Sequence, residues 1–238
     1  MKALNLILVL GAAASLNSVV AAQQSQPAPA NEKMSQPAHD KAPEKAGEKA
    51  PKEIKVGDTL PEMKFKDADG KEVDSKSLYA KEPAVIMFYR GNWCPFCNKS
   101  LQAFQTKVSE AKDLGATITA ISPEKPEELK ETAKKDGLTY ALLSDSTGEG
   151  MKSLGLAFDL DDATQTKYKG FGVNLASHNA NGKWQLPHPA TLVVDTKGVV
   201  RYAYVNEDYQ QRADPNTVIE AVRKLKAEEG GKTEKGAK

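Results

Sequence analysis

The chain has 238 residues, with 33 Lys and Arg, 32 Asp and Glu, and a formal net charge of +1 at pH 7. Because charges of both signs are mixed along the chain, nothing predicts binding to nucleic acid or to an anionic membrane surface. This length suits one large domain or two small ones.

The first 22 residues have the layout of a secretory signal peptide. A short basic start, Met1-Lys2, precedes an apolar stretch from Ala3 to Val20, and Ala21-Ala22 supply small residues for cleavage. An uncleaved membrane anchor is the alternative, but polar residues interrupt the apolar stretch. We therefore expect export, most simply to a bacterial periplasm, and no stable membrane insertion after cleavage.

Residues 23–52 consist mostly of Ala, Pro, Lys, Glu, Gln and Ser. Such a segment cannot bury enough apolar surface to offset the loss of chain entropy, so we predict a disordered linker. Residues 230–238 are similarly polar and are predicted to form a disordered tail. A single folded domain is therefore expected over residues 53–229.

The folded part is expected to begin with a β-hairpin. Met63 and Phe65 alternate with lysines, and Asp69-Gly70 supplies the turn. The apolar run Ala84–Tyr89 is typical of a buried strand. Apolar residues spaced three or four apart then predict a helix that ends near Leu114.

Strands and helices continue to alternate in the middle of the chain. We predict a strand over 116–121, a charged helix over 126–136, a short strand over 140–143 and a helical turn over 150–157. Residues 159–183 lack a clear periodicity and are predicted to form a long loop or insertion.

The domain is expected to end with a strand pair and a helix. Thr191–Asp195 and Val199–Val205 are the two strands, and Asp214-Pro215 starts the helix. One face of that helix is apolar and consists of Val218, Ile219, Val222 and Leu225. This order predicts an α/β fold with a central mixed sheet flanked by helices.

The only two cysteines, Cys94 and Cys97, are spaced C-x-x-C where the Ala84–Tyr89 strand meets the following helix. The first amides of a helix have no internal partners, and the helix dipole favours negative charge there. A thiolate is such a charge, so we expect Cys94 to be acidic and reactive, with Cys97 one turn further in. The pattern predicts thiol redox chemistry that needs no cofactor.

Two other roles for the cysteines are weaker. A structural disulfide would close so small a ring that it would hardly constrain the unfolded chain. A zinc site completed by His178 and His188 would lack the usual close spacing of ligands, because these histidines are ten residues apart. We therefore predict no bound metal.

Two neighbours of the cysteines have two interpretations each. Arg90 could stabilise a thiolate electrostatically, or lie on the surface with its stem packed. Trp93 could shield the cysteines and contact a partner, or be an ordinary core aromatic.

Three motifs carry a resemblance to a known family: Gly57–Pro61, Phe88–Cys97 and Pro189–Gly198. Together, over about Val56–Leu225, they resemble the thioredoxin-like fold and, more narrowly, its peroxiredoxin-like branch, the alkyl hydroperoxide reductase/thiol-specific antioxidant family. The resemblance implies that fold with the β-hairpin as an N-terminal extension. It also implies that Pro189 matches a cis-proline that faces the cysteines. His188, just before it, would shuttle protons or raise the thiolate fraction of a cysteine, unless it is a half-exposed loop residue.

The family motif P-x-x-x-[T/S]-x-x-C can be aligned on Cys97, which puts Arg90 in place of the proline and Cys94 in place of the hydroxyl residue. The family arginine precedes the late strand, where this chain has His188-Pro189, so Arg90 or Arg201 would have to replace it. The thioredoxin motif W-C-x-x-C instead makes Cys94 the attacking thiol and Cys97 the resolving one. Both alignments stay open.

The resemblance implies a thiol-based antioxidant oxidoreductase of the peroxiredoxin type, which reduces peroxides and forms a disulfide that a thiol donor re-reduces. A periplasmic thiol–disulfide oxidoreductase acting on protein disulfides is the alternative, and a non-catalytic binding domain is the second alternative. The expected partners are a peroxide or disulfide substrate and a reducing dithiol donor, either thioredoxin-like or membrane-linked.

Overall fold

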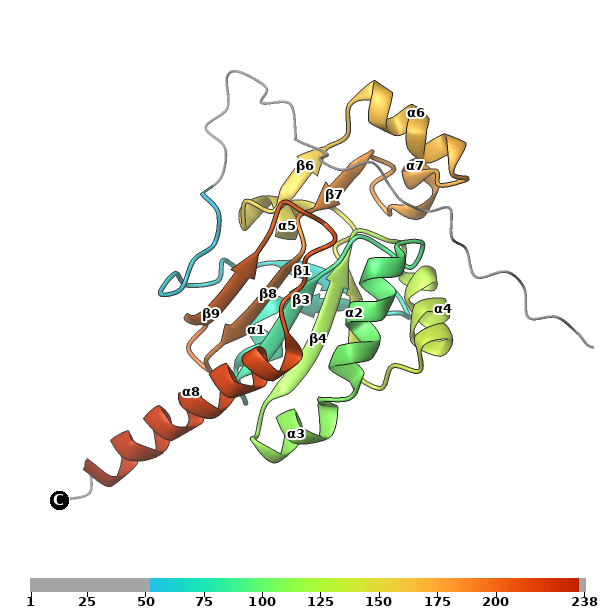
Figure 1. Cartoon of the computed structure of the whole chain (residues 1–238). Helices are drawn as coiled ribbons and strands as arrows, with labels where there is room; N and C mark the ends of the chain where they lie inside the picture. Colours follow the sequence, from blue (N-terminus) through green and yellow to red (C-terminus); the bar gives the residue numbers. More distant parts are fainter. Residues whose placement is uncertain (1–51, 236–238) are drawn as a thin grey trace, which may run out of the picture. The chain divides into compact units, whose positions relative to one another are not determined.

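The computed structural model describes residues 52–235. Its centre is a seven-stranded mixed sheet, in which β3, β4 and β5 run parallel and the outer strands pair antiparallel (Figure 1). In spatial order the strands are β2 (Glu72–Asp74), β1 (Lys64–Lys66), β5 (Ala141–Ser144), β4 (Thr117–Ser122), β3 (Ala84–Phe88), β8 (Ala190–Val194) and β9 (Val200–Val205). The predicted mixed sheet and its N-terminal hairpin, β1–β2, are confirmed.

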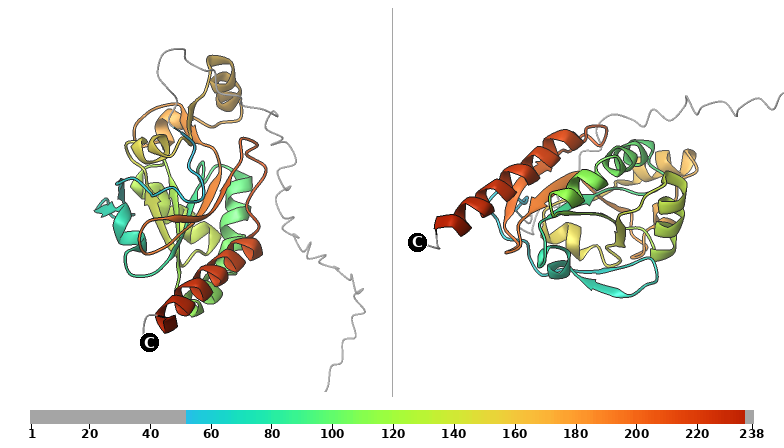
Figure 2. Two further views of the ribbon diagram at one scale, coloured as in Figure 1. Left: turned by 90° about the vertical axis from the view of Figure 1, so that its left-hand side faces the viewer. Right: turned by 90° about the horizontal axis from the view of Figure 1, so that it is seen from below.

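The central strand β3 is buried on both faces, which explains its unbroken apolar sequence. Because side chains alternate along a strand, Val85 and Met87 face one core while Ile86 and Phe88 face the other. The sheet therefore separates two layers of helices (Figure 2).

The first layer contains the helix that carries the cysteines. Its helices are α2 (Pro95–Gln105), α3 (Val108–Asp113), α4 (Pro126–Asp136) and α8 (Pro215–Lys235). On the other face lie the short helices α1 (Ser75–Tyr79) and α5 (Glu149–Ser153). The four residues predicted as the apolar face of α8 are all buried in the first layer.

The helix predicted after the cysteines is in fact two helices, so the single helix to Leu114 was wrong. The break lies at Thr106, whose hydroxyl donates a hydrogen bond of 2.7 Å to the Ala103 carbonyl. Lys107 then has a ψ of −1°, which starts the new helix α3 at a different angle. The turn at Thr106-Lys107 therefore separates α2 from α3.

Residues 159–183, predicted to form a long loop or insertion, form an insertion with two helices of its own. It contains α6 (Asp162–Gly170) and α7 (Leu175–His178), between the two strands of a small antiparallel sheet, β6 (Ala157–Asp159) and β7 (Gln185–Pro187). Asp161 caps α6 by accepting a 2.7 Å hydrogen bond from the Thr164 amide. The insertion has its own core, formed by Phe158, Leu160, Tyr168, Val173, Leu175 and Leu186.

The predictions for the two ends of the chain have different outcomes. The predicted signal peptide, residues 1–22, and nearly all of the predicted linker lie outside the described residues. At the other end, α8 continues to Lys235, past the point where a disordered tail was predicted to begin at residue 230. Ala227, Glu228 and Glu229 all favour helix, so the helix does not end at the glycine pair that follows. Within residues 52–235, no helix is both long and apolar enough to cross a lipid bilayer.

Candidate functional site

The two thiols lie at the start of α2, directly after the end of β3. Cys94 occupies the N-cap position in an extended conformation, Pro95 is the first helical residue, and Cys97 lies in the first turn. Both cysteines are free, and their exposed fractions are 0% and 1%. The site is therefore a buried dithiol at a helix N-terminus.

Four interactions decide the protonation state of Cys97. Burial by itself raises the pKa of this thiol, because a charged sulfur loses its hydration. Four smaller effects act the other way: a hydrogen bond from the Cys94 thiol, the charge of Arg212, whose Nη2 is 3.4 Å from Sγ, a hydrogen bond from the Arg90 backbone and the charge of Arg90. Together they lower the pKa of Cys97 to about 5.

Cys94 has the opposite shift, so the expectation that it would be the acidic thiol was wrong. Cys94 donates a hydrogen bond to Cys97 and is buried, and both effects raise the pKa of Cys94 well above its usual value. Its N-cap side chain forms no hydrogen bond to the helix amides. Arg90 and Arg212 act on both thiols, but for Cys94 the hydrogen bond to Cys97 and burial outweigh them.

Arg90 is fully buried, so its alternative placement on the surface was wrong. Its guanidinium carbon lies 4.4 Å from the ring centre of Tyr209, 5.4 Å from that of Trp93 and 5.6 Å from that of Tyr168. These distances are within the range of cation–π contacts, which help to hold a charge away from water. The buried cation beside Cys97 is thus surrounded by aromatic rings from three segments of the chain.

Trp93 is half-buried and contacts two hydrophobic clusters. It packs against the first helix layer and against the insertion, where its ring meets Tyr168 edge-to-face at 5.6 Å. Phe96, between the cysteines, meets Tyr209 in the same way. Tyr168, Tyr209 and Arg212 were missed by sequence reasoning, because no local pattern marks a residue that reaches the site from elsewhere in the chain.

Pro189 does reach the cysteine site. It lines a small cavity together with Cys97, Thr191, Tyr204 and Arg212. No peptide bond among the described residues is cis, so the resemblance to a cis-proline does not extend to the isomer. The cavity is small, about 10 Å³, and it is lined by Cys97 but not by Cys94.

His188 points elsewhere. Its ring stacks on Phe158 with the ring centres 4.5 Å apart, and its amide donates to the Leu156 carbonyl at 2.8 Å. Burial lowers the pKa of His188. Neither cysteine is among the contacts of its ring, so the structure gives no geometric support for a proton shuttle between His188 and Cys94.

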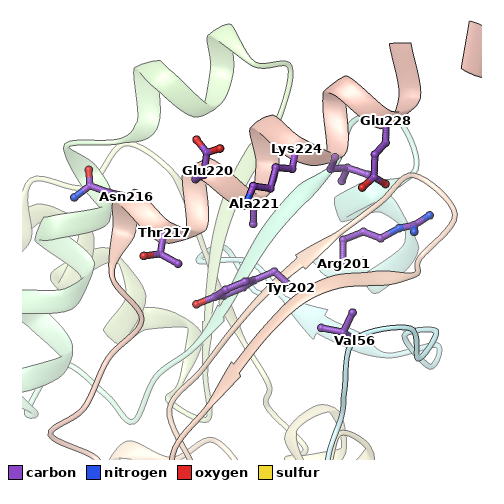
Figure 3. Close-up of a pocket in the computed structure, with 10 residues that line it drawn as sticks. Val56, Arg201, Tyr202, Asn216, Thr217, Glu220, Ala221, Lys224 and Glu228 are labelled. Carbon is purple, nitrogen blue, oxygen red and sulfur yellow. The ribbon is translucent and has the colours of Figure 1, made fainter. Parts of the chain in front are cut away.

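Arg201 is also remote from the cysteines. Its Nη2 is 2.7 Å from Asp195 Oδ2, and it lines a groove of about 860 Å³ between α8 and β9 (Figure 3). Tyr202, Glu220 and Lys224 line the same groove, which contains neither cysteine. Arg212, rather than Arg201, supplies the second cation at Cys97.

A buried carboxylate lies directly beneath the cysteine loop, and sequence reasoning missed it. Glu124 is 0% exposed, and its Oε1 accepts a 2.8 Å hydrogen bond from the Asn92 amide. Burial raises the pKa of Glu124 to about 8, with the Asn92 hydrogen bond acting against that rise. The loop fits this closely only because residue 91 is glycine: a Cβ there would be 2.7 Å from Glu124 Oε1 and 2.3 Å from Trp93 Nε1.

The zinc alternative with two cysteines and two histidines is not formed. Within the described residues, one group of three or more potential metal ligands meets, and it consists of Glu124, Glu128 and His178. It contains neither cysteine, and His188 is not part of it.

The comparisons with known proteins agree with this geometry. Residues 56–203 match the model of the AhpC/TSA family. The chain is similar to the chloroplastic peroxiredoxin Q of Triticum aestivum, with 33% identity over 155 residues, which covers 65% of this chain and 61% of that protein. It is also similar to the chloroplastic peroxiredoxin Q of Sedum lineare, with 30% identity over 174 residues, 73% of this chain and 81% of that protein.

Solved structures show the same fold. The peroxidoxin BcpB of Mycobacterium tuberculosis superposes with a TM-score of 0.59 at 22% identity, covering 72% of this chain and 98% of that one. A peroxiredoxin-like protein from Aquifex aeolicus gives the same TM-score at 19% identity, over 74% and 90%. On the family match and the similarity to the peroxiredoxin Q proteins, this chain belongs to the AhpC/TSA family.

Proposed function

We propose that the protein is a thiol-dependent peroxide reductase in which Cys97 attacks the peroxide and Cys94 resolves the product. One observation carries this assignment: the acidic thiol, Cys97, is also the one that lines a cavity, beside the Arg212 guanidinium. A reactive cysteine needs both thiolate character and access for its substrate. The similarity to proteins named peroxiredoxin Q supports the peroxide as the electrophile.

In the first step the Cys97 thiolate attacks the nearer oxygen of a peroxide ROOH, and the O–O bond breaks. The sulfur becomes a sulfenic acid and RO⁻ leaves, taking up one proton to give ROH. Arg212 and Arg90 hold positive charge next to the sulfur. They favour the thiolate before the attack, and they can stabilise the negative charge that develops on the peroxide oxygens.

In the second step the Cys94 sulfur attacks the Cys97 sulfenic acid and water leaves, so that a disulfide forms. The contact between the two sulfurs already exists, because Cys94 donates a hydrogen bond to Cys97. That proton is placed to leave with the hydroxyl group. Two electrons from a dithiol donor, thioredoxin-like or membrane-linked, then restore both thiols.

Export to a bacterial periplasm belongs to the same proposal. It is supported by the basic and apolar start of the sequence, and it would explain why the chain needs an external dithiol donor in an oxidising compartment. The expected observation is a mature N-terminus at Gln23 after expression in a Gram-negative host. A protein that retains Met1 in the cytoplasm would refute this part.

The central test is single-turnover oxidation of the reduced protein by hydrogen peroxide, with oxidised glutathione as the competing oxidant. Tryptophan fluorescence is a suitable signal because Trp93 adjoins Cys94 in the chain. Cys94→Ser should react with peroxide as fast as the wild type and accumulate a sulfenic acid on Cys97, detectable by a sulfenic-acid reagent and mass spectrometry. Cys97→Ser should react no faster than an unactivated thiol.

The alternatives predict different outcomes in the same experiment. Slow peroxide oxidation, together with a mixed disulfide trapped on Cys94 in Cys97→Ser, would replace this proposal with a thiol–disulfide oxidoreductase. If neither oxidant reacts with the wild type, the protein is a non-catalytic binding domain. The raised pKa of Cys94 argues against the first of these.

A further inference from the structure

Three potential metal ligands from different segments meet beside the cysteine loop. Glu124 follows β4, Glu128 is in the first turn of α4, and His178 is the last residue of α7 in the insertion. One ligand atom from each lies within 4.8 Å of the other two. Neither the reaction proposed above nor the peroxiredoxin likeness uses this group.

The group consists of two carboxyl groups and one imidazole, and Glu124 Oε2 also accepts a 3.3 Å hydrogen bond from the Ser122 hydroxyl. Within the described part of the chain, the ion-pair contact of these carboxylates is the 3.4 Å approach of His178 Nδ1 to Glu128 Oε1. That approach has no hydrogen-bond geometry, and Nδ1 is buried without a hydrogen-bond partner. A bare imidazole nitrogen facing a carboxylate is repulsive unless a cation lies between them. The geometry therefore calls for a proton or a metal ion at this point.

The surrounding hydrogen bonds already hold the carboxylates in place. The Asn92 amide donates to Glu124 Oε1 at 2.8 Å, and its side chain donates to Glu128 Oε2 at 3.0 Å. His178 is fixed through its carbonyl, which accepts a 2.9 Å hydrogen bond from the Lys125 amide. Such outer hydrogen bonds orient the ligands of metal sites, and here they leave Glu128 Oε1 and His178 Nδ1 facing each other.

We propose that Glu124, Glu128 and His178 bind one divalent transition-metal ion such as Zn²⁺. Imidazole nitrogen and carboxylate oxygen are ligands that Zn²⁺ accepts, and three protein ligands leave a fourth position for water. The side chains of Glu128 and His178 are 22% and 27% exposed, so the ion can enter from solvent. Glu124, which is 0% exposed, would bind the ion from the protein interior. The ion would neutralise the carboxylates and join the insertion to the cysteine loop through Asn92.

The test uses the Cys94→Ser/Cys97→Ser protein, because free thiolates bind Zn²⁺ themselves. Zn²⁺ affinity is measured by competition with a chromophoric chelator, and Co²⁺ is added in parallel to record its absorption spectrum. We expect one ion per chain, a higher Tm with the ion bound, and no sulfur-to-cobalt band. His178→Ala and Glu128→Gln, each made in the thiol-free protein, should weaken binding at least about tenfold.

Two matched variants control for general effects. Glu127→Gln removes the same charge from the same turn of α4, but Glu127 is exposed and outside the group. His188→Ala removes a histidine that stacks on Phe158. Both should bind Zn²⁺ as the thiol-free parent does.

Three results would overturn the proposal. They are an absence of binding in the thiol-free protein, equal losses in Glu127→Gln and Glu128→Gln, and unchanged affinity in His178→Ala. In each case the cation between His178 and Glu128 would be a proton. None of these measurements involves peroxide, so their failure leaves the peroxide-reductase proposal untouched, and failure of that proposal leaves the metal site untouched.

Discussion

The helices α2 and α4 begin in the same way and carry opposite chemistry. Each follows a strand of the parallel pair β3–β4, each has proline as its first residue, and neither has a side-chain cap. Yet the start of α2 holds thiols opposite two arginines, whereas the start of α4 holds Glu127 and Glu128, with Glu124 just before it. Both helices start from an extended residue followed by proline, so this shared start does not account for the difference.

The comparison shows which forces set the acidity of a cysteine here. A helix N-terminus favours negative charge by less than about 2 kcal/mol even in favourable geometries. The Cys94 thiol at the very start of α2 nevertheless has a raised pKa, and Cys97 in the first turn has a lowered one. The hydrogen bond from Cys94 is the largest of the effects that lower the pKa of Cys97, and the charges of Arg212 and Arg90 add to it.

Asn92 connects the two helix starts, since it precedes α2 and binds both Glu124 and Glu128. Substitutions of Gly91, Arg212 and Asn92 test what makes the two helix starts differ. The pH profile of peroxide oxidation tests the acidity of Cys97.

The largest loss of stability is expected from Gly91→Ala, because it would push the cysteine loop away from Glu124. The added Cβ would collide with Trp93 and with the buried Glu124, so overpacking and the positive φ of 155° together should lower the free energy of unfolding by about 2–4 kcal/mol. Gly70→Ala is the control, because residue 70 also has a positive φ but no atom within 4 Å. It should cost about 1 kcal/mol in urea unfolding. Equal costs would contradict the close contact.

Next in size is Arg212→Met, which removes the cation and keeps the apolar stem. We expect the pKa of Cys97 to rise by about 1–2 units, equivalent to about 1.4–2.7 kcal/mol, because Arg90 remains. Thiolate absorbance at 240 nm, followed against pH in the Cys94→Ser background, measures this rise relative to the parent. Arg201→Met, a cation paired with Asp195, should leave the Cys97 pKa unchanged.

Asn92→Ala should have a smaller effect, because the backbone bond to Glu124 persists. Loss of the 3.0 Å side-chain bond to Glu128 is expected to lower the free energy of unfolding by about 1–2 kcal/mol. Asn174→Ala is the matched change at an exposed asparagine whose side chain makes no capping bond to α7. Thermal or urea unfolding should show that Asn92→Ala is less stable than Asn174→Ala. Equal stabilities would show that the hydrogen bond between Asn92 and Glu128 does not stabilise the fold.

The smallest change is expected in the pH dependence of peroxide oxidation by the wild type. Since the pKa of Cys97 is lowered to about 5, the thiolate is already formed above pH 6. The second-order rate constant should vary less than about twofold between pH 6.5 and 8 and fall about tenfold per unit well below pH 5. A rate that keeps rising through pH 8 would instead identify a thiol with a high pKa, as Cys94 has, as the nucleophile.

Much of the fold could be predicted from local patterns. The apolar run of β3, the hairpin and the buried face of α8 all show a period or a turn that only one structure satisfies. The α6–α7 insertion could not, because its short helices are stabilised by a small core of residues scattered from Phe158 to Leu186. The turn between α2 and α3 interrupts a continuous helical pattern of apolar residues, so that pattern does not reveal it.

Only part of the candidate site could be predicted from local sequence patterns. The cysteine pair and its position at a helix start follow directly from the sequence. Arg212 lies 115 residues from Cys97 and comes from an irregular segment before α8, so only the folded chain shows that it touches the sulfur. Glu124 follows β4 and reaches the cysteine loop only because that strand is paired beside β3.

The burial of both sulfurs has a consequence for the timing of turnover. A protein dithiol must bring its own sulfur into contact with residues that are 0% and 1% exposed. In the proposed cycle, reduction therefore requires the protein to open locally around the two sulfurs. Its rate should level off as the reductant concentration rises, at the frequency with which this part of the protein opens by itself.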